Sequence, residues 1–405
     1  KMENLKKFLQ SKENQILTNL KTGEPNEQQL NNFTLNFTNQ LEQLTLQAPS
    51  EVKRICQNGI VSIGWDSKRR QRIPTSTMTS STVLSGIRQI QTDLENLNPP
   101  IEPNANELAD ISIAANRLWD LDVNRLIPQT DYIINVQGGK KIYNEGDAAS
   151  EPFFTYVDAS VFERPTYRAF RQLLDNYVAE TGVAENVTTE ERRENQTFLN
   201  LIADTPVMKY CHRYLVLKGY APADKNEFIN LLNDLWFGLY KREVQNDSSG
   251  FEHVFLGEIK DGEVTGLHNW IQLYDEEKSH RLDYLGYILP KRNPSVGGYR
   301  VSAQDQQLVT IQFTWKGFLK KCSSSFIGTS PEFEIALYTI CFLQQQEKYL
   351  VNCGPYRVEI TCYKYTSRGK NYIGTCFPTD APLDENEAAS KIQSSYRGQS
   401  ARKTK

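Results

Sequence analysis

The sequence predicts an α+β protein in which helices dominate the first part of the chain and an antiparallel sheet dominates the second. Two observations support this fold class. As far as Val178, apolar residues recur mainly at the spacing of amphipathic helices. After Gly250 the pattern changes to short runs of alternating apolar and polar residues, which is typical of strands with one buried face.

The N-terminal region, residues 1–100, is expected to be helical. Met2–Leu20 and Glu27–Leu46 are polar stretches with apolar stripes, and the Gly-Glu-Pro sequence at Gly23–Pro25 separates them. Residues 69–85 are basic and then rich in Ser and Thr, which predicts a loop. The amphipathic stretch Val83–Leu97 should end at the Asn-Pro-Pro that follows, because a residue before proline disfavours the helical conformation. No function is assigned to this region.

A second domain is expected over residues 106–380. Its first part should contain helices, including Leu118–Leu126 and Pro165–Val178. Its second part should contain the sheet, with strands expected at Leu308–Trp315, Tyr356–Tyr365 and Tyr372–Phe377. Residues 381–405 then form an acidic, Pro-containing linker and a basic tail.

The composition restricts the class of protein. A mean hydropathy of -0.55 and the absence of a long apolar run argue against a membrane span. The net charge is -3, so binding of a polyanion must depend on a local basic groove. Candidates for that groove are Arg281, Lys291, Arg292, Lys320 and Lys321. Seven cysteines without close pairing favour a reducing compartment, and so a cytoplasmic protein, although a secreted one remains compatible with a truncated N-terminus.

His253 and His268 are the most informative residues, because the chain has only 4 histidines and these two flank one predicted hairpin. Asp261-Gly262 between β-prone runs predicts a two-residue type I′ turn that pairs Lys260 with Glu263. The same register carried outward would place both histidines on one face as diagonal neighbours, with Cβ atoms about 7–8 Å apart. The stretch from Leu267 onward also has helical spacing, which would place His268 near the first turn of a helix instead.

Two imidazoles at this spacing suit general acid–base catalysis, because their pKa lies near neutrality. Cleavage of RNA through its own 2′-hydroxyl needs a base for that proton, an acid for the departing 5′-oxygen and a cation near phosphorus. Lys316, Lys320 and Lys321 follow downstream and can supply the cation. A metal hydrolase is the alternative, but no H-x-x-x-H or C-x-x-C spacing supplies further ligands.

Several phrases, in order, resemble the EndoU family of uridylate-specific endoribonucleases. They are LWDLDVNRL, GDAASEPFFTYVD, FEHVFLGEI, GLHNW and FLKKCSSSFIGTSPEFEIALYTICF, and the resemblance runs from Asn106 to Pro378. It implies an α+β nuclease domain of two packed lobes that cleaves single-stranded RNA at uridines and leaves 2′,3′-cyclic phosphate and 5′-hydroxyl ends. It also implies stimulation by a divalent cation, Mn²⁺ or Ca²⁺, for which no residues are assigned.

The resemblance assigns roles to individual residues. His253 and His268 match the two catalytic histidines, and Lys320 matches the catalytic lysine in W-x-G-x-x-K. We expect His268 to be the base and His253 the acid, although these two roles could be exchanged. Ser324 matches the position that reads the uracil edge, and Glu252 and Glu258 match supporting acidic positions beside the first histidine. Both glutamates could equally be ordinary edge-strand carboxylates.

The sequence departs from the family pattern near its carboxyl end. Tyr372 and Phe377 are expected to contact the substrate, but Phe377 stands where the family typically has Tyr before Pro. Phenylalanine can stack on uracil but cannot donate a hydrogen bond. We therefore expect a looser preference for uridine than in relatives.

The tail at residues 388–405 resembles an IQ motif, a basic amphipathic helix that calmodulin or a related EF-hand protein binds. The pattern I-Q-x-x-x-R-G-x-x-x-R is complete, with Ile392, Gln393, Arg397, Gly398 and Arg402. A basic tail that adds non-specific RNA affinity is the simpler reading. The tail also leaves an alternative function open, that of a catalytically weak RNA-binding module regulated or localised by a calmodulin-type partner.

Overall fold

The computed structural model describes residues 2–23, 25–46, 50–66, 69, 71–73, 78–97, 101–289 and 307–381. The chain divides into two compact units, Lys1–Pro100 and Ile101–Lys405. The mixture of helices and sheets confirms the predicted α+β class. The tail predicted to bind calmodulin, and Lys291 and Arg292 of the predicted basic groove, lie outside the described residues.

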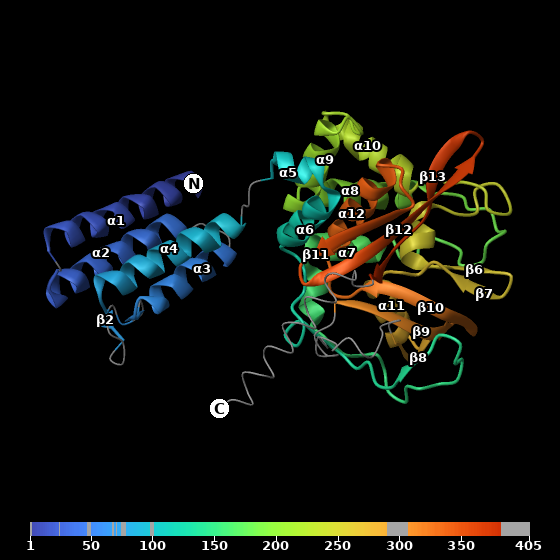
Figure 1. Cartoon of the computed structure of the whole chain (residues 1–405), viewed down its shortest axis with the longest axis horizontal. Helices are drawn as coiled ribbons and strands as arrows, with labels where there is room; N and C mark the ends of the chain where they lie inside the picture. Colours follow the sequence, from blue (N-terminus) through green and yellow to red (C-terminus); the bar gives the residue numbers. More distant parts are fainter. Residues whose placement is uncertain are drawn as a thin grey trace, which may run out of the picture. The chain divides into compact units, whose positions relative to one another are not determined.

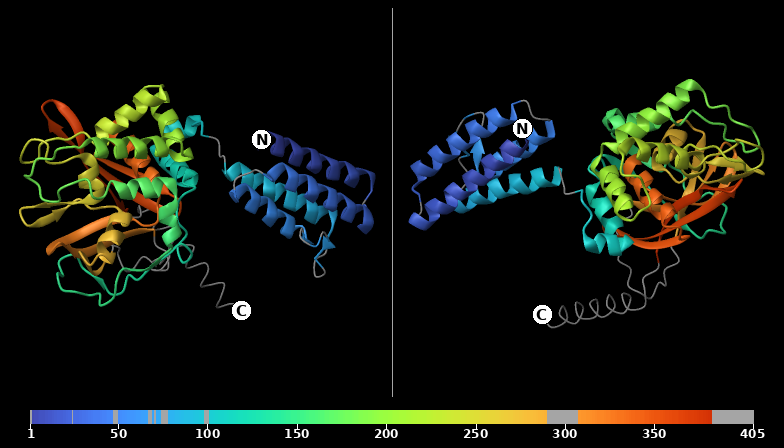
Figure 2. Two further views of the ribbon diagram at one scale, coloured as in Figure 1. Left: turned by 180° about the vertical axis from the view of Figure 1, so that it is seen from behind. Right: turned by 90° about the horizontal axis from the view of Figure 1, so that it is seen from above.

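The first unit is a helical bundle with its own core (Figure 2). Its elements are α1 (Met2–Thr22), α2 (Glu27–Thr45), α3 (Ser50–Ser62), β1 (Trp65–Asp66), β2 (Gln71–Arg72) and α4 (Ser80–Leu97). Asn26 caps α2 through a capping box with Gln29, which satisfies backbone N–H groups that the helix leaves open. The predictions of α1, α2 and α4 are confirmed, whereas α3 was missed. The loop predicted at residues 69–85 is wrong in part, because β2 and the start of α4 lie within it.

The second unit begins with most of its helices. They are α5 (Ala105–Ala109), α6 (Ile111–Leu121), η1 (Ala159–Glu163), α7 (Pro165–Gln172), α8 (Thr189–Ala203), α9 (Pro206–Leu217) and α10 (Lys225–Trp236). The helix predicted at Leu118–Leu126 is shifted, because α6 starts seven residues earlier, at Ile111, and stops at Leu121. Asp110 caps its start by accepting from the N–H of Ser112 at 2.8 Å. Short strands β3 (Tyr132–Ile134), β4 (Gly139–Lys140) and β5 (Phe154–Val157) interrupt this helical part.

Two sheets make up most of the second half of this unit. One has the order β10-β9-β8-β4, with β8 (Leu282–Ile288), β9 (Leu308–Trp315) and β10 (Phe318–Phe326). The other is β11-β12-β13, with β11 (Lys348–Cys353), β12 (Tyr356–Ser367) and β13 (Lys370–Asp380). The strands predicted downstream of residue 307 are confirmed within β9, β12 and β13. All pairs in these sheets are antiparallel except β4 with β8.

Helix α12 (Pro331–Leu343) packs between the helical part and the sheet β11-β12-β13 (Figure 1). It contacts α6, α7 and α9 and also β12 and β13. Every residue from Pro331 to Cys341 is buried, as expected of a helix surrounded by protein. One continuous core therefore joins both parts and fixes the position of the strands that carry the site. No helix among the described residues is long and apolar enough to cross a membrane.

Candidate active site

The predicted hairpin forms, but it is shorter than the sequence suggests. Strands β6 (Glu258–Lys260) and β7 (Glu263–Thr265) pair Lys260 with Glu263, as expected. The turn residues Asp261 and Gly262 have φ of 51° and 77°, the two positive values that a type I′ turn requires. The strands end before either histidine is reached, so the outward continuation of the register is wrong.

His253 lies on a π-helical turn, η2 (Glu252–Leu256), and His268 lies between β7 and α11 (Trp270–Lys278). The N–H of Leu267 donates to the carbonyl of His253 at 3.1 Å, and the N–H of His268 donates to the carbonyl of Val254 at 2.8 Å. The returning chain therefore pairs with carbonyls of the helical turn, and the two histidines are not diagonal neighbours on a strand ladder. The alternative prediction of a helix here is confirmed by α11, which starts at Trp270.

Gly266 makes this close approach sterically feasible. Its φ is +63°, and a Cβ atom built there would lie 1.7 Å from the carbonyl oxygen of His253. No side chain fits at that distance, so only glycine allows the chain after β7 to approach the backbone of His253 so closely. The two histidines are thus brought together by a backbone contact rather than by a continuous strand ladder.

The environment of His253 is ionic. Its Nδ1 lies 2.6 Å from Oε2 of Glu258, which is also 3.1 Å from Nε of Arg242 and accepts a hydrogen bond from Ser248 through its other oxygen. Burial would raise the pKa of the Glu258 carboxyl, but His253 and Arg242 outweigh it and hold the pKa below its usual range. Glu258 is therefore ionised, and His253 donates its Nδ1 proton to it. Burial holds the pKa of His253 below its usual value, and the Glu258 carboxylate opposes that effect only in part.

The hydrogen-bond partners of His268, in contrast, are uncharged. Its Nδ1 lies 3.0 Å from the carbonyl oxygen of Ser324, which can only accept, so Nδ1 carries the proton and Nε2 is left as the basic nitrogen. The hydroxyl of Ser323 lies 3.2 Å from the same Nδ1 and donates to the carbonyl of Leu267. Burial, the charge of Lys320 and the proximity of His253 together hold the pKa of His268 well below its usual value. His268 is therefore a neutral imidazole at pH 7.

Lys320 lies on β10, next to a register shift between Lys320 and Ser323 in the pairing of β10 with β9. Such irregularities bend a strand and redirect its side chains. Lys320 is buried, and burial lowers the pKa of its ammonium group to about 8. Its charge lowers the pKa of both His253 and His268, so the three groups share one electrostatic site. Within the described part of the chain, no carboxylate forms an ion pair with Lys320.

The remaining predicted residues differ in how close they lie to the two histidines. Phe377 stacks on the ring of His268 with centroids 4.8 Å apart, and Ser324 is buried with its hydroxyl 2.7 Å from that of Thr310. Tyr372 instead packs against Tyr240, with ring centroids 5.0 Å apart. The carboxyl of Glu252 accepts from Ser249, and burial with the nearby Glu185 raises its pKa well above the usual range.

Sequence reasoning missed three residues that hold the site. Arg242 and Ser248 fix Glu258, and the Ser323 hydroxyl contacts the Leu267 carbonyl and the ring of His268. Arg242 also donates to the carbonyl of Gly374 on β13 at 2.8 Å, which links that strand to the Glu258 carboxylate. Ser323 could have been identified from the Ser cluster after Lys320. Arg242 carries no such signal, because no sequence pattern links it to Glu258 or to Gly374, which is 132 positions away.

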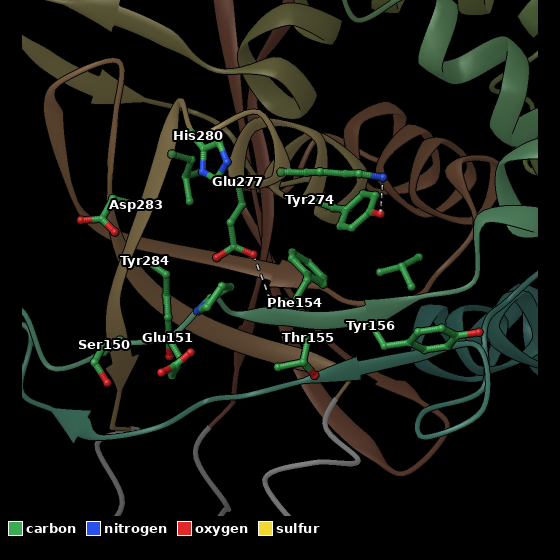
Figure 3. A pocket seen from close by; sticks show the side chains of 15 residues that line it. Ser150, Glu151, Phe154, Thr155, Tyr156, Tyr274, Glu277, His280, Asp283 and Tyr284 are labelled. Atoms are coloured by element: carbon green, nitrogen blue, oxygen red, sulfur yellow. Dashed lines mark hydrogen bonds between the residues drawn. The ribbon is translucent and has the colours of Figure 1, made fainter.

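A separate pocket of about 620 Å³ lies between β5, the end of α11 and the start of β8 (Figure 3). Its lining includes Phe154, Tyr274 and Glu277, and the Glu277 carboxylate accepts from the N–H groups of Phe153 and Phe154. Neither His253, His268 nor Lys320 lines it. Among the residues that the structure describes, no group of three or more His, Cys, Asp or Glu side chains is arranged to hold a metal ion. The family resemblance to a cation-stimulated enzyme is therefore not matched by such a cluster in the described part of the chain.

Residues 110–378 match the family described as Endoribonuclease XendoU. The chain belongs to this family. The resemblance found in the sequence is thereby confirmed, and the protein is an enzyme of the endoribonuclease type. Uridylate-specific endoribonuclease B of Danio rerio is 43% identical over 277 residues, covering 66% of this chain and 95% of its own. Poly(U)-specific endoribonuclease-A of Xenopus laevis is 44% identical over 281 residues, covering 66% and 93%.

A solved XendoU structure, described as that of "a splicing independent snoRNA processing endoribonuclease", is also similar. It has 43% sequence identity and a TM-score of 0.57, over 67% of this chain and 98% of its own. The family match begins at residue 110, so the helical unit at Lys1–Pro100 lies outside it.

Proposed function

We propose that this protein cleaves single-stranded RNA at uridines by attack of the 2′-hydroxyl on the adjacent phosphorus. The products would be a 2′,3′-cyclic phosphate and a 5′-hydroxyl end. The observation that carries the proposal is the unequal pair of histidines, one bound to a carboxylate and the other to a backbone carbonyl, with Lys320 coupled to both.

His268 is the general base in this proposal. Its Nδ1 is held by the Ser324 carbonyl, so Nε2 has a free lone pair that can accept the 2′-hydroxyl proton. The low pKa of His268 keeps that nitrogen unprotonated across the neutral range. The 2′-oxygen then forms the bond to phosphorus as it loses its proton.

His253 is the general acid. Its imidazolium form carries protons on both nitrogens, and the Glu258 carboxylate stabilises that form through Nδ1. The Nε2 proton can then pass to the 5′-oxygen as the bond between phosphorus and that oxygen breaks. Lys320 supplies positive charge in a desolvated site, where it stabilises the extra negative charge of the phosphorane-like transition state.

Uridine selection is assigned to Ser324 and Phe377. The Ser324 hydroxyl can both donate and accept, and a substrate would have to share or replace its bond with Thr310. Phe377 is half-buried, so part of its ring is available to stack on a base while it packs on His268. The uridylate and poly(U) specificities in the names of the relatives support this assignment.

The decisive experiment uses a 5′-labelled oligonucleotide with a single uridine, incubated with the wild-type protein and with His268→Ala. We expect cleavage after that uridine to give a cyclic phosphate by mass spectrometry, and we expect no cleavage by the variant. A matched oligonucleotide with 2′-deoxyuridine should resist both proteins, because it lacks the nucleophile. Cleavage of the deoxy substrate would refute the mechanism, and intact binding without any cleavage would favour the RNA-binding module.

Three further proposals rest on the sequence and the family. A divalent cation, Mn²⁺ or Ca²⁺, is proposed to stimulate cleavage by acting on RNA binding or conformation, because no ligand set was found among the described residues. Cleavage measured with EDTA and with each ion tests this.

The tail from Ile392 to Arg402 is proposed to bind a calmodulin-type protein, and its removal should abolish retention on immobilised calmodulin. A cytoplasmic location, favoured by the cysteine pattern, is proposed on the same footing.

A further inference from the structure

Cys362 and Cys376 face each other across the strands β12 and β13. They are direct partners in the register, and their sulfur atoms lie 2.6 Å apart. Both side chains are buried in the core of the second unit, with exposed fractions of 4% and 0%. A disulfide bond has a length of about 2.04 Å, so only a small adjustment separates the two thiols from bonding distance.

The backbone around the pair also suits a disulfide. The N–H of Cys362 donates to the carbonyl of Glu347 at 2.8 Å, on the side of β11. In a strand, the N–H and C=O of one residue point to the same side, so Cys362 makes no ladder bonds toward β13. Cys362 and Cys376 are therefore a non-hydrogen-bonded pair, for which the Cα atoms lie about 4.5 Å apart and the side chains are closest. That separation falls within the range of about 4.4–6.8 Å seen for disulfides.

Burial alone does not place cysteines in this way. Cys211 is equally buried in the same core, yet its thiol is directed to the carbonyl of Ala336, with sulfur and oxygen 3.6 Å apart. The pairing of Cys362 with Cys376 comes from the register of β12 with β13, which the hairpin between them fixes.

We propose that Cys362 and Cys376 are a modification site at which one intramolecular disulfide forms when the chain folds in contact with a small-molecule disulfide such as oxidised glutathione. One cysteine thiolate attacks a glutathione sulfur, forms a mixed disulfide and releases one glutathione thiolate. The second cysteine thiolate then attacks the protein sulfur of that mixed disulfide and releases the second glutathione. Both cysteines are oxidised, oxidised glutathione is reduced, and each released thiolate takes up a proton. Because both sulfurs are buried, the exchange takes place during folding or a transient opening of the hairpin.

The bond would strengthen the strand that supports the candidate active site. Phe377, which packs on His268, follows Cys376 directly, and the carbonyl of Gly374 accepts from Arg242. A link at Cys376 closes only a short loop through the β12–β13 hairpin and restricts the unfolded chain. We expect the oxidised protein to unfold at a temperature several degrees higher than the reduced protein.

The full chain is refolded in a buffer of reduced and oxidised glutathione, and in parallel with dithiothreitol. Free thiols are then alkylated in denaturant, and the peptides are mapped by mass spectrometry. We expect one linked peptide pair that contains Cys362 and Cys376, with the remainder of the 7 cysteines alkylated. The gain in unfolding temperature should disappear in Cys376→Ser, whereas Cys211→Ser should keep the linked pair.

Full alkylation of all 7 cysteines in natively folded, glutathione-treated protein would overturn the proposal, as would a link between other cysteines. Neither measurement uses RNA, so the outcome is independent of the proposed nuclease function.

Discussion

Replacement of Lys320 by Met should abolish cleavage and at the same time stabilise the fold. Burial lowers the pKa of this ammonium group from 10.5 to about 8. At 1.36 kcal/mol for each pH unit, keeping the lysine charged in the fold costs about 3 kcal/mol at pH 7. Methionine fills a similar volume without that cost, as in other replacements of buried charges by apolar side chains. In the proposed mechanism, the site therefore retains a destabilising charge because catalysis requires it.

The sign of the effect depends on pH. The pKa of Lys320 is lower in the folded than in the unfolded chain, so the cost is fully present below pH 8 and vanishes as the pH rises toward 10.5. We expect Lys320→Met to raise the Tm of the second unit by roughly 5 °C at pH 7, with a smaller gain at pH 9.5. Tryptophan fluorescence is suitable, because of the 5 tryptophans only Trp65 lies in the first unit.

Lys321→Met is the matched control. Lys321 is the next residue, but it is exposed and pairs with Glu145 at the surface, so its replacement should change Tm by less than about 1 °C. A Tm for Lys320→Met equal to or below that of the wild type would refute the electrostatic reasoning. Cleavage by Lys320→Met at more than about one hundredth of the wild-type rate would refute its role in stabilising the transition state.

The other predictions concern the histidines and the base they select. Glu258→Gln removes the charge that supports protonated His253, so the alkaline limb of the profile of kcat/KM against pH should move to lower pH, and kcat/KM at pH 7 should fall roughly tenfold to hundredfold. An unmoved limb would show that Glu258 does not change the pKa of His253. Gly266→Ala should lower both the activity and the Tm. Gly262→Ala should lower the Tm only slightly, because Gly262 is also at positive φ but a Cβ atom there would lie 3.8 Å from the nearest atom; equal losses would contradict the steric argument. Phe377→Tyr should increase the preference for uridine over cytidine about threefold to tenfold in matched oligonucleotides, and an unchanged preference would count against Phe377 as a specificity residue.

The sequence was sufficient to predict the elements whose pattern is local. Strand β9 occupies Leu308–Trp315 as predicted, because most of its residues are β-branched or aromatic and favour strands. The turn at Asp261-Gly262 forms because glycine and aspartate tolerate the required φ. The boundaries of α6 and α7 were less predictable, since capping at Asp110 and packing on the core, rather than periodicity, determine where those helices begin and end.

A strand is predicted at His253 from the sequence, whereas the structure has a helical turn there. The sequence does contain a signal for that turn. Phe251 and Phe255 are four residues apart, and both pack on Phe170 in the core. That spacing is helical, but it lies within a run that also alternates like a strand. Gly257, with φ of +90°, ends the turn and lets the chain enter β6. The core contacts of the two phenylalanines therefore determine the local structure.

The proposed roles of the two histidines differ because their hydrogen-bond partners differ. A carboxylate stabilises an imidazolium, whereas a carbonyl oxygen only orients a neutral ring. Glu258 is five residues from His253 and stays ionised because Arg242 and Ser248 hold it, while Ser324 reaches His268 from another strand. Exchange of acid and base would require a protonated His268 beside Lys320, and no carboxylate among the described residues is paired with either group. The arrangement of acceptors therefore favours His253 as the acid and His268 as the base.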